Sequence, residues 1–162
     1  MVRFYERLGK RLSLYVKQLA WLNTPRVRKS KKKNEDLPAR IEEMKRDAIA
    51  PALPQIEAEY IADWLFEIGP VVPAGMGKAR IGWQDIAAWS ALSGVEPEPW
   101  EAKLLRSLSG AYLAMSLDAE DPQCPAPYQD EATIIANSAA VAARSREAAE
   151  ARARARQSGQ IG

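Results

Sequence analysis

The sequence predicts an all-α fold: a small helical domain of about four to five helices, with an N-terminal basic amphipathic helix and an Ala/Arg-rich C-terminal helix. In several segments, apolar residues recur every three or four positions, which is the spacing of one helix face. No segment alternates apolar and polar residues as a half-buried strand does. With 162 residues, 47% of them hydrophobic, the chain is long enough to bury one core.

The N-terminal segment, residues 2–22, has the clearest helical pattern. Its apolar stripe follows a 4-3-4-3 spacing and consists of Leu8, Leu12, Tyr15, Leu19 and Leu22. The polar sequence Asn23-Thr24-Pro25 ends this helix. Residues 26–34 are basic and contain a single apolar side chain, so we expect them to form a solvated linker.

Four further helices are expected in the body of the chain, at residues 38–50, 55–68, 84–93 and 99–117. Prolines and glycines separate them. Proline cannot donate a helical hydrogen bond, and glycine is the preferred residue at the position just after a helix. The segment 70–80 contains two prolines and two glycines. We therefore expect an irregular loop there, without regular structure.

After residue 129 the pattern becomes helical again, with Ile134, Ile135 and Val141 as its large apolar residues. Beyond Val141 the chain is mostly Ala, Arg and Glu, which form helices readily but offer little surface to bury. We expect residues 142–162 to form an exposed helix that frays into a disordered end.

Charge and composition divide the chain into three regions. Residues 1–33 contain eleven Lys/Arg and one acid, residues 34–131 contain seven Lys/Arg and eighteen acids, and residues 132–162 contain five Arg and two Glu. We therefore expect a basic amphipathic arm and linker at 1–36, a helical core domain at 37–128, and an Ala/Arg-rich helical tail at 129–162.

Composition excludes much of the common catalytic machinery. The chain has no histidine and a single cysteine, Cys124, so imidazole bases, His- or Cys-rich metal sites and internal disulfides are ruled out. We expect no catalytic residue, no metal site and no cofactor. Charges interrupt every apolar stretch before the length of a membrane span, so we expect no membrane insertion and a cytoplasmic location.

The basic arm has three candidate partners. Nucleic acid is attracted to clustered lysine and arginine, and the candidate nucleic-acid-binding residues are Arg26, Arg28, Lys29, Lys31, Lys32 and Lys33. An anionic membrane surface would attract the same amphipathic helix. An acidic protein surface, including the acidic body of the chain itself, is the third candidate.

The tryptophans carry a second functional signal. Four of the five, Trp64, Trp83, Trp89 and Trp100, fall within 37 consecutive residues. Large rings supply buried area to a small core, and aromatic residues are also enriched at the centres of protein interfaces. The pattern therefore leaves two roles open, a core and a partner-binding groove.

Three segments of the chain resemble a known family. Residues 60–70 read YIADWLFEIGP, residues 81–94 read IGWQDIAAWSALSG, and residues 99–113 read PWEAKLLRSLSGAYL. In this order they resemble the tail assembly chaperones of long-tailed double-stranded DNA phages and related prophages, the lambda-like tail assembly chaperone family. The resemblance covers about a third of the chain.

This resemblance implies a transient role without enzymatic activity, in the cytoplasm of the bacterial host cell. Such chaperones bind the tape measure protein, keep it soluble, help recruit tail tube subunits, and are absent from the finished virion. The implied partners are therefore the tape measure protein and the tail tube protein, with self-association as a further possibility. The candidate partner-binding residues are Tyr60, Trp64, Phe66, Trp83, Trp89 and Trp100.

Two other functions stay open at this point. The first is a nucleic-acid-binding packaging or regulatory protein that acts through the basic residues 1–33. The second is a structural helical adaptor, such as a tail or head-completion component.

Overall fold

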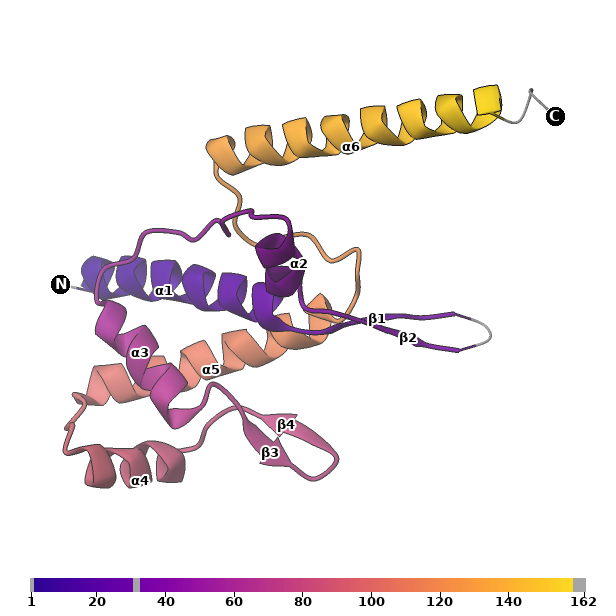
Figure 1. Cartoon of the computed structure of the whole chain (residues 1–162). Coiled ribbons are helices and arrows are strands. Elements are labelled where there is room, and N and C mark those ends of the chain that lie inside the picture. The colour runs from indigo at the N-terminus through magenta and orange to yellow at the C-terminus, as the bar shows by residue number, and fades with distance from the viewer. Residues whose placement is uncertain (1, 31–32, 159–162) are drawn as a thin grey trace. The chain divides into compact units, whose positions relative to one another are not determined.

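The computed structural model describes residues 2–30 and 33–158, which contain six helices and two short antiparallel hairpins (Figure 1). The chain forms two compact units, residues 1–128 and residues 129–162. The first unit contains α1 (Val2–Asn23), β1 (Arg26–Arg28), β2 (Glu35–Leu37), α2 (Arg40–Arg46), α3 (Glu59–Ile68), β3 (Val72–Ala74), β4 (Gly77–Ala79), α4 (Trp83–Ser93) and α5 (Pro99–Ala119). The second contains α6 (Glu131–Ser158). The prediction of a mostly helical protein is confirmed, but a strictly all-α fold is wrong.

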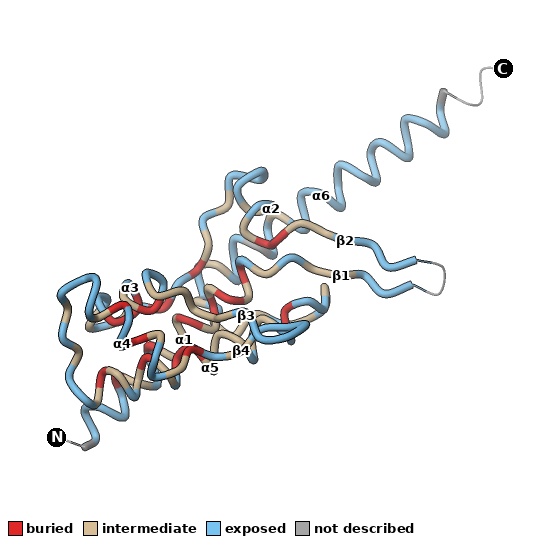
Figure 2. Tube along the Cα trace, turned by 90° about the horizontal axis from the view of Figure 1, so that it is seen from below, coloured by how far each residue is buried: buried red, intermediate tan, exposed pale blue. Residues whose placement is uncertain are grey.

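Helices α1 and α5 form the centre of the first unit and lie side by side in parallel (Figure 1). Leu8, Leu12 and Val16 of α1 pack in one cluster with Leu105 and Leu108 of α5, and all five are buried. Figure 2 shows the buried positions gathered where these helices meet α3 and α4. The α1–α5 pair therefore forms the centre of the core, and α3 and α4 pack against it.

The buried stripe of α1 differs in part from the predicted one. Val16 and Ala20 are fully buried, whereas Tyr15 and Leu19 are half-buried. The buried positions Leu8, Leu12, Val16 and Ala20 thus recur every four residues, a row that winds slowly around the helix because four residues exceed one turn of 3.6.

Helix α1 does not form an arm separate from the body. The structure places α1 in one unit with everything up to Tyr128, because its apolar stripe supplies half of the central helix pair. Gln18 adds polar contacts to the same unit: its side chain donates to the carbonyl of Ala52 at 3.0 Å and accepts from the backbone N–H of Tyr128 at 3.1 Å.

Helices α3 and α4 cover one side of the central pair. Ile61 and Leu65 of α3 and Ile86 of α4 are buried in the same cluster as α1 and α5. The hairpin that joins α3 to α4 is attached through the buried Ser109 of α5. The Ser109 hydroxyl accepts from the N–H of Ile81 at 2.9 Å and donates to the carbonyl of Pro70 at 2.7 Å.

Both hairpins lie where the sequence predicted irregular chain. β1 lies in the segment 26–34 expected as a solvated linker, and β2 follows directly after that segment. β3 and β4 both lie in the segment 70–80 expected as an irregular loop. Each strand has three residues, too few to show an alternating pattern in the sequence. At the β3–β4 turn, Gly75 adopts φ = +56°, a conformation that glycine reaches without strain.

Arg40 joins the base of the first hairpin to the ends of the two central helices. Its guanidinium is buried, stacks on Trp21 at 4.5 Å, and donates to the carbonyls of Trp21, Ala119 and Asp121 at 2.8–3.2 Å. These carbonyls lie at or just beyond the C-terminal ends of α1 and α5, where the helix leaves acceptors unpaired and the dipole favours a cation. Burial, the largest cause, lowers the pKa of Arg40 below its usual range.

The second unit is the single helix α6. Every described side chain in it is exposed or half-exposed, including Ile134, Ile135 and Val141. The helix continues to Ser158, so the expected helical tail is present, while the last four residues lie outside the described part of the chain. None of the helices in the described residues is long and apolar enough to cross a membrane.

Candidate functional site

Half-exposed aromatic rings gather at the end of the first unit where α1 and α5 begin. We define the aromatic face as Phe4, Tyr5, Tyr60, Trp64 and Trp100. Ring centroids lie 5.7 Å apart for Phe4 and Tyr5, 4.8 Å for Tyr5 and Trp100, and 4.7 Å for Tyr60 and Trp64. These are the separations at which aromatic pairs attract each other. Three helices, α1, α3 and α5, thus contribute to one surface.

The aromatic face rests on the core. Trp64 and Trp100 are partly buried against the central cluster, while Phe4, Tyr5 and Tyr60 are 47%, 39% and 41% exposed. The aromatic face therefore packs against the helical core on one side and exposes apolar surface to solvent on the other.

Trp89 lies beneath this face. Its ring centroid is 5.5 Å from that of Trp64, and its side chain is 8% exposed. Its indole N–H finds no hydrogen-bond partner among the described residues. Of the two roles that the sequence left open for the tryptophans, Trp89 has the core role, because a partner cannot reach its ring.

A hydrogen bond links the rings of α3 in the aromatic face to the beginning of α5. The Tyr60 hydroxyl donates to Glu101 Oε1 at 2.7 Å, and Glu101 follows Trp100 directly in the chain. The other carboxylate oxygen of Glu101 accepts from the backbone N–H of Glu98 at 2.7 Å, at the first turn of α5. Burial, the largest cause, and the bond to Glu101 raise the pKa of Tyr60 to about 12.

The surroundings of Tyr60 and Trp64 are acidic. Helix α3 carries Glu59, Asp63 and Glu67, all exposed, and no basic residue. The nearby turn before α5 adds Glu96 and Glu98, which are also exposed. An apolar partner segment with positive charges beside its apolar stripe would therefore meet favourable electrostatics here.

Two of the predicted partner-binding residues lie apart from the aromatic face. Phe66 contacts Tyr112 edge-on, with centroids 5.8 Å apart. Trp83 is 50% exposed and stacks under the guanidinium of Arg106 at 4.4 Å. Neither has a ring contact with the five residues of the face among the described ring pairs. The structure thus brings together Tyr60, Trp64, Trp89 and Trp100 but not Phe66 or Trp83.

The sequence interpretation missed Phe4 and Tyr5. They precede Leu8 by four and three positions, so they continue the apolar stripe of α1 by one turn toward its beginning. That periodicity was the available signal. Which other rings they contact depends on the pairing of α1 with α5.

The basic segment forms the β1–β2 hairpin, whose two strands pair in register from Arg26 opposite Leu37 to Arg28 opposite Glu35. Arg26 forms an ion pair with Glu43 and donates to the carbonyl of Pro38, and Arg28 pairs with Glu35 at 3.1 Å. Lys29 and Lys33 are exposed. Lys31 and Lys32, also predicted to bind nucleic acid, lie outside the described residues.

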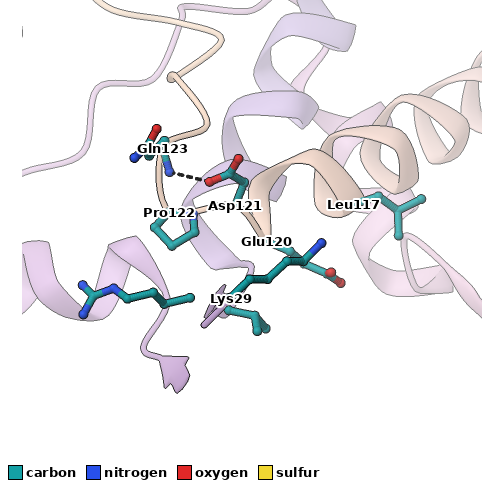
Figure 3. Close-up of a pocket in the computed structure, with 8 residues that line it drawn as sticks. Lys29, Leu117, Glu120, Asp121, Pro122 and Gln123 are labelled. Carbon is teal, nitrogen blue, oxygen red and sulfur yellow. Dashed lines mark hydrogen bonds between the residues drawn. The ribbon is translucent and has the colours of Figure 1, made fainter. Parts of the chain in front are cut away.

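A cavity of about 490 Å³ lies between this hairpin and the end of α5 (Figure 3). Its walls combine the apolar Leu117 and Pro122 with Lys29, Glu120 and Asp121. Asp121 already accepts a hydrogen bond from the backbone N–H of Gln123 at 2.9 Å (Figure 3). The described lining therefore offers a surface of mixed charge at the base of the hairpin.

Among residues 2–30 and 33–158, no group of three or more Cys, Asp or Glu side chains is arranged to hold a metal ion. A scan against protein-family models, a search of curated proteins and a search of solved structures each found no match to this chain. The function is therefore inferred from the residues themselves.

Proposed function

We propose that this protein is a tail assembly chaperone that binds apolar helical segments of the tape measure protein through the aromatic face. In this role it keeps the tape measure protein soluble in the cytoplasm of the bacterial host, assists assembly of the tail tube around it, and is absent from the finished virion. The observation that carries the proposal is the group of half-exposed rings from α1, α3 and α5 on one packed frame.

Physical chemistry supports a binding role for such a surface. Exposed aromatic rings leave apolar area in contact with water, and a partner that covers them recovers that free energy. Contacts among the rings and with the core already restrict them, so little side-chain entropy is lost on binding. A long helical partner with repeated apolar stripes could be covered by many copies, each bound weakly enough to be released.

Co-expression with the tape measure protein from the same gene cluster tests this proposal. Replacing Phe4, Tyr5 and Tyr60 by Ser removes the three most exposed rings of the face. We expect the tape measure protein to move from the soluble to the insoluble fraction with this variant, while circular dichroism shows that the variant stays folded.

A matched control replaces three exposed apolar residues elsewhere, Met76, Leu92 and Val141, by Ser. This control should keep the tape measure protein soluble. Retention of solubility with the folded aromatic-face variant, or equal loss with both variants, would contradict the proposal. Mass spectrometry of purified particles tests the remaining part, since the chain should be missing from them.

A second candidate function, nucleic-acid binding, is favoured by one observation. The basic segment is an antiparallel ribbon with Lys29 and Lys33 exposed beyond its paired strands. The major groove of DNA admits a two-stranded ribbon, and lysines on such a ribbon can neutralise phosphates.

Binding to a double-stranded DNA fragment at several salt concentrations tests this second function. Replacing Lys29 and Lys33 by Glu should weaken binding and lower the salt dependence by about two counterions. A matched double variant in which Lys45 and Lys78 become Glu should bind like the unaltered protein. No measurable DNA binding at low salt would exclude this function.

A further inference from the structure

A second surface, separate from most of the aromatic face, follows the central helix pair. An open groove with a volume of about 770 Å³ runs along α1 and α5, from Tyr5 to Lys17 on the α1 side and past Leu104 and Ser107 on the α5 side. This stretch of α1 covers twelve helical steps, or roughly 18 Å. The groove is therefore long enough for a partner helix of about three turns.

Small side chains keep the groove open. Gly9 and Ser13 of α1 and Ser107 of α5 line it and leave room for a helix to approach closely. Leu14 and Leu104 are half-buried beside them and offer apolar contact. A Cβ atom added at Gly9 would lie 3.6 Å from Leu104 Cδ1, an ordinary van der Waals contact, so the backbone of Gly9 accepts a Cβ without a clash with α5.

The charges of the groove are mainly positive. Lys10 and Lys17 line it, seven residues or about two helical turns apart, and Glu6 at one end is its single acid among the lining residues. Within the described part of the chain, no ion pair involves Lys10 or Lys17. On another side of the same helix, Arg11 already pairs with Glu57 at 3.5 Å. The two lysines are thus available to an acidic partner.

We propose that this α1–α5 groove binds an amphipathic α-helix of another protein, with an apolar stripe facing Leu14 and Leu104 and acidic residues seven positions apart facing Lys10 and Lys17. The charge of the groove selects this partner, because a basic helix of the same shape would meet two like charges. The site does not depend on the chaperone function, since the groove shares only Tyr5 with the aromatic face.

Binding of synthetic peptides to the full chain, followed by fluorescence anisotropy, tests the proposal. The probe peptide has about 14 residues, a leucine stripe and glutamates at positions i and i+7. One control peptide carries lysines in place of the glutamates, and another has the same composition in scrambled order. We expect the probe to bind at least about tenfold more tightly than either control peptide.

Charge reversal of the groove supplies the decisive variant. With Lys10→Glu and Lys17→Glu together, the preference should invert, so that the lysine peptide binds more tightly than the glutamate peptide. The matched control, Lys45→Glu with Lys78→Glu, changes the net charge equally and should keep the original preference. A preference that is unchanged by reversal in the groove, or inverted equally by the control, would overturn the proposal.

Filling the groove gives an independent test. Gly9→Leu should reduce binding of the glutamate peptide by about tenfold or more while the thermal melting curve still shows a folded protein. Full binding by folded Gly9→Leu would show that the peptide lies elsewhere and would overturn the proposal. Should that variant fail to fold, the charge-reversal pair still decides. Self-association that the peptide competes away would assign the groove to a second copy of the chain instead, and would equally overturn it.

Discussion

Helices α1 and α6 are both long and rich in charge, yet the large apolar side chains are buried in α1 and exposed in α6. In α1, with 22 residues, Leu8, Leu12, Val16 and Ala20 are at most 4% exposed. In α6, with 28 residues, Ile134, Ile135 and Val141 are each at least 50% exposed. Helix propensity accounts for both helices, but only apolar residues that recur every three or four positions give a helix a face to bury. The difference between them is therefore one of pattern, since both sequences favour a helix.

The same contrast between covered and uncovered side chains occurs within α4. Trp89 is 8% exposed beneath the aromatic face, whereas Trp83, at the beginning of the helix, is 50% exposed. Replacing Trp89 by Ala should lower the free energy of unfolding by about 3–5 kcal/mol, because it leaves a large cavity. Trp83→Ala should cost less than about 1 kcal/mol. Guanidinium unfolding measures both, and equal losses would show that Trp89 is not a core residue.

The comparison of α1 with α6 gives the next largest effect. Leu12 is fully buried, so Leu12→Ala should lower the free energy of unfolding by about 3 kcal/mol. Ile135→Ala removes a similar volume from α6 and should change the unfolding of the first unit by less than about 0.5 kcal/mol. Tryptophan fluorescence follows that unit selectively, since all five tryptophans lie before residue 129. A comparable loss from the α6 variant would mean that α6 contributes to the core.

Arg40 tests whether a buried polar group contributes to the α1–α5 pair. Arg40→Leu leaves the carbonyls of Trp21, Ala119 and Asp121 without their donor and should cost about 2–3 kcal/mol. Lysine should rescue only part of the loss, because one ammonium cannot reproduce the planar fork of donors. Arg46→Leu, at an exposed arginine of the same helix, is the control. Equal melting temperatures for the two leucine variants would refute this role.

The smallest expected effect depends on pH and concerns the bond between Tyr60 and Glu101. The folded protein raises the pKa of Tyr60 to about 12 from the ordinary value of 10.0, so folding favours the protonated phenol. The stability that this shift contributes is complete below pH 10 and is lost as the pH rises toward 12. Tyr60→Phe loses the hydrogen bond to Glu101 and should be less stable than the unaltered protein at pH 8. The difference in stability should narrow at pH 11, because unfolding of the unaltered protein then ionises the phenol. Urea unfolding at pH 8 and pH 11 measures the difference in unfolding free energy between the two proteins. The same difference at both pH values would contradict a raised pKa of Tyr60 in the folded protein.

Much of the helical architecture could be predicted from periodicity and from the residues that end helices. The expected helix at 84–93 corresponds to α4 (Trp83–Ser93), and the expected helix at 99–117 corresponds to α5 (Pro99–Ala119). In both, a glycine or proline marks the boundary. The two hairpins could not be predicted in the same way, because each strand has only three residues and some of the contacts that hold the first hairpin come from residues distant in the sequence. The N–H of Val27, for example, donates to the carbonyl of Glu120 at 2.8 Å.

The sequence predicted that aromatic residues make up the candidate site, but it did not predict which of the rings contact one another. Tyr60 and Trp64 are four positions apart, so one helix face brings them together. Phe66 follows Trp64 by two positions and therefore lies on a different side of α3, beside Tyr112. Trp100 could be joined to Tyr5 only by the packing of α1 along α5, which no local spacing reveals.

The sequence by itself determined most of the helical segments, that α1 has an apolar stripe, and that α6 lacks one, because these properties depend on neighbours within two turns. The expected helices at 38–50 and 55–68 are shorter in the structure, where α2 spans Arg40–Arg46 and α3 spans Glu59–Ile68. Tertiary structure decided that α1 belongs to the body of the first unit and that rings from α1, α3 and α5 meet in one face. It also left an open groove with two lysines along α1 and α5. These features depend on which helix covers which, and that choice comes from packing between residues far apart in the chain.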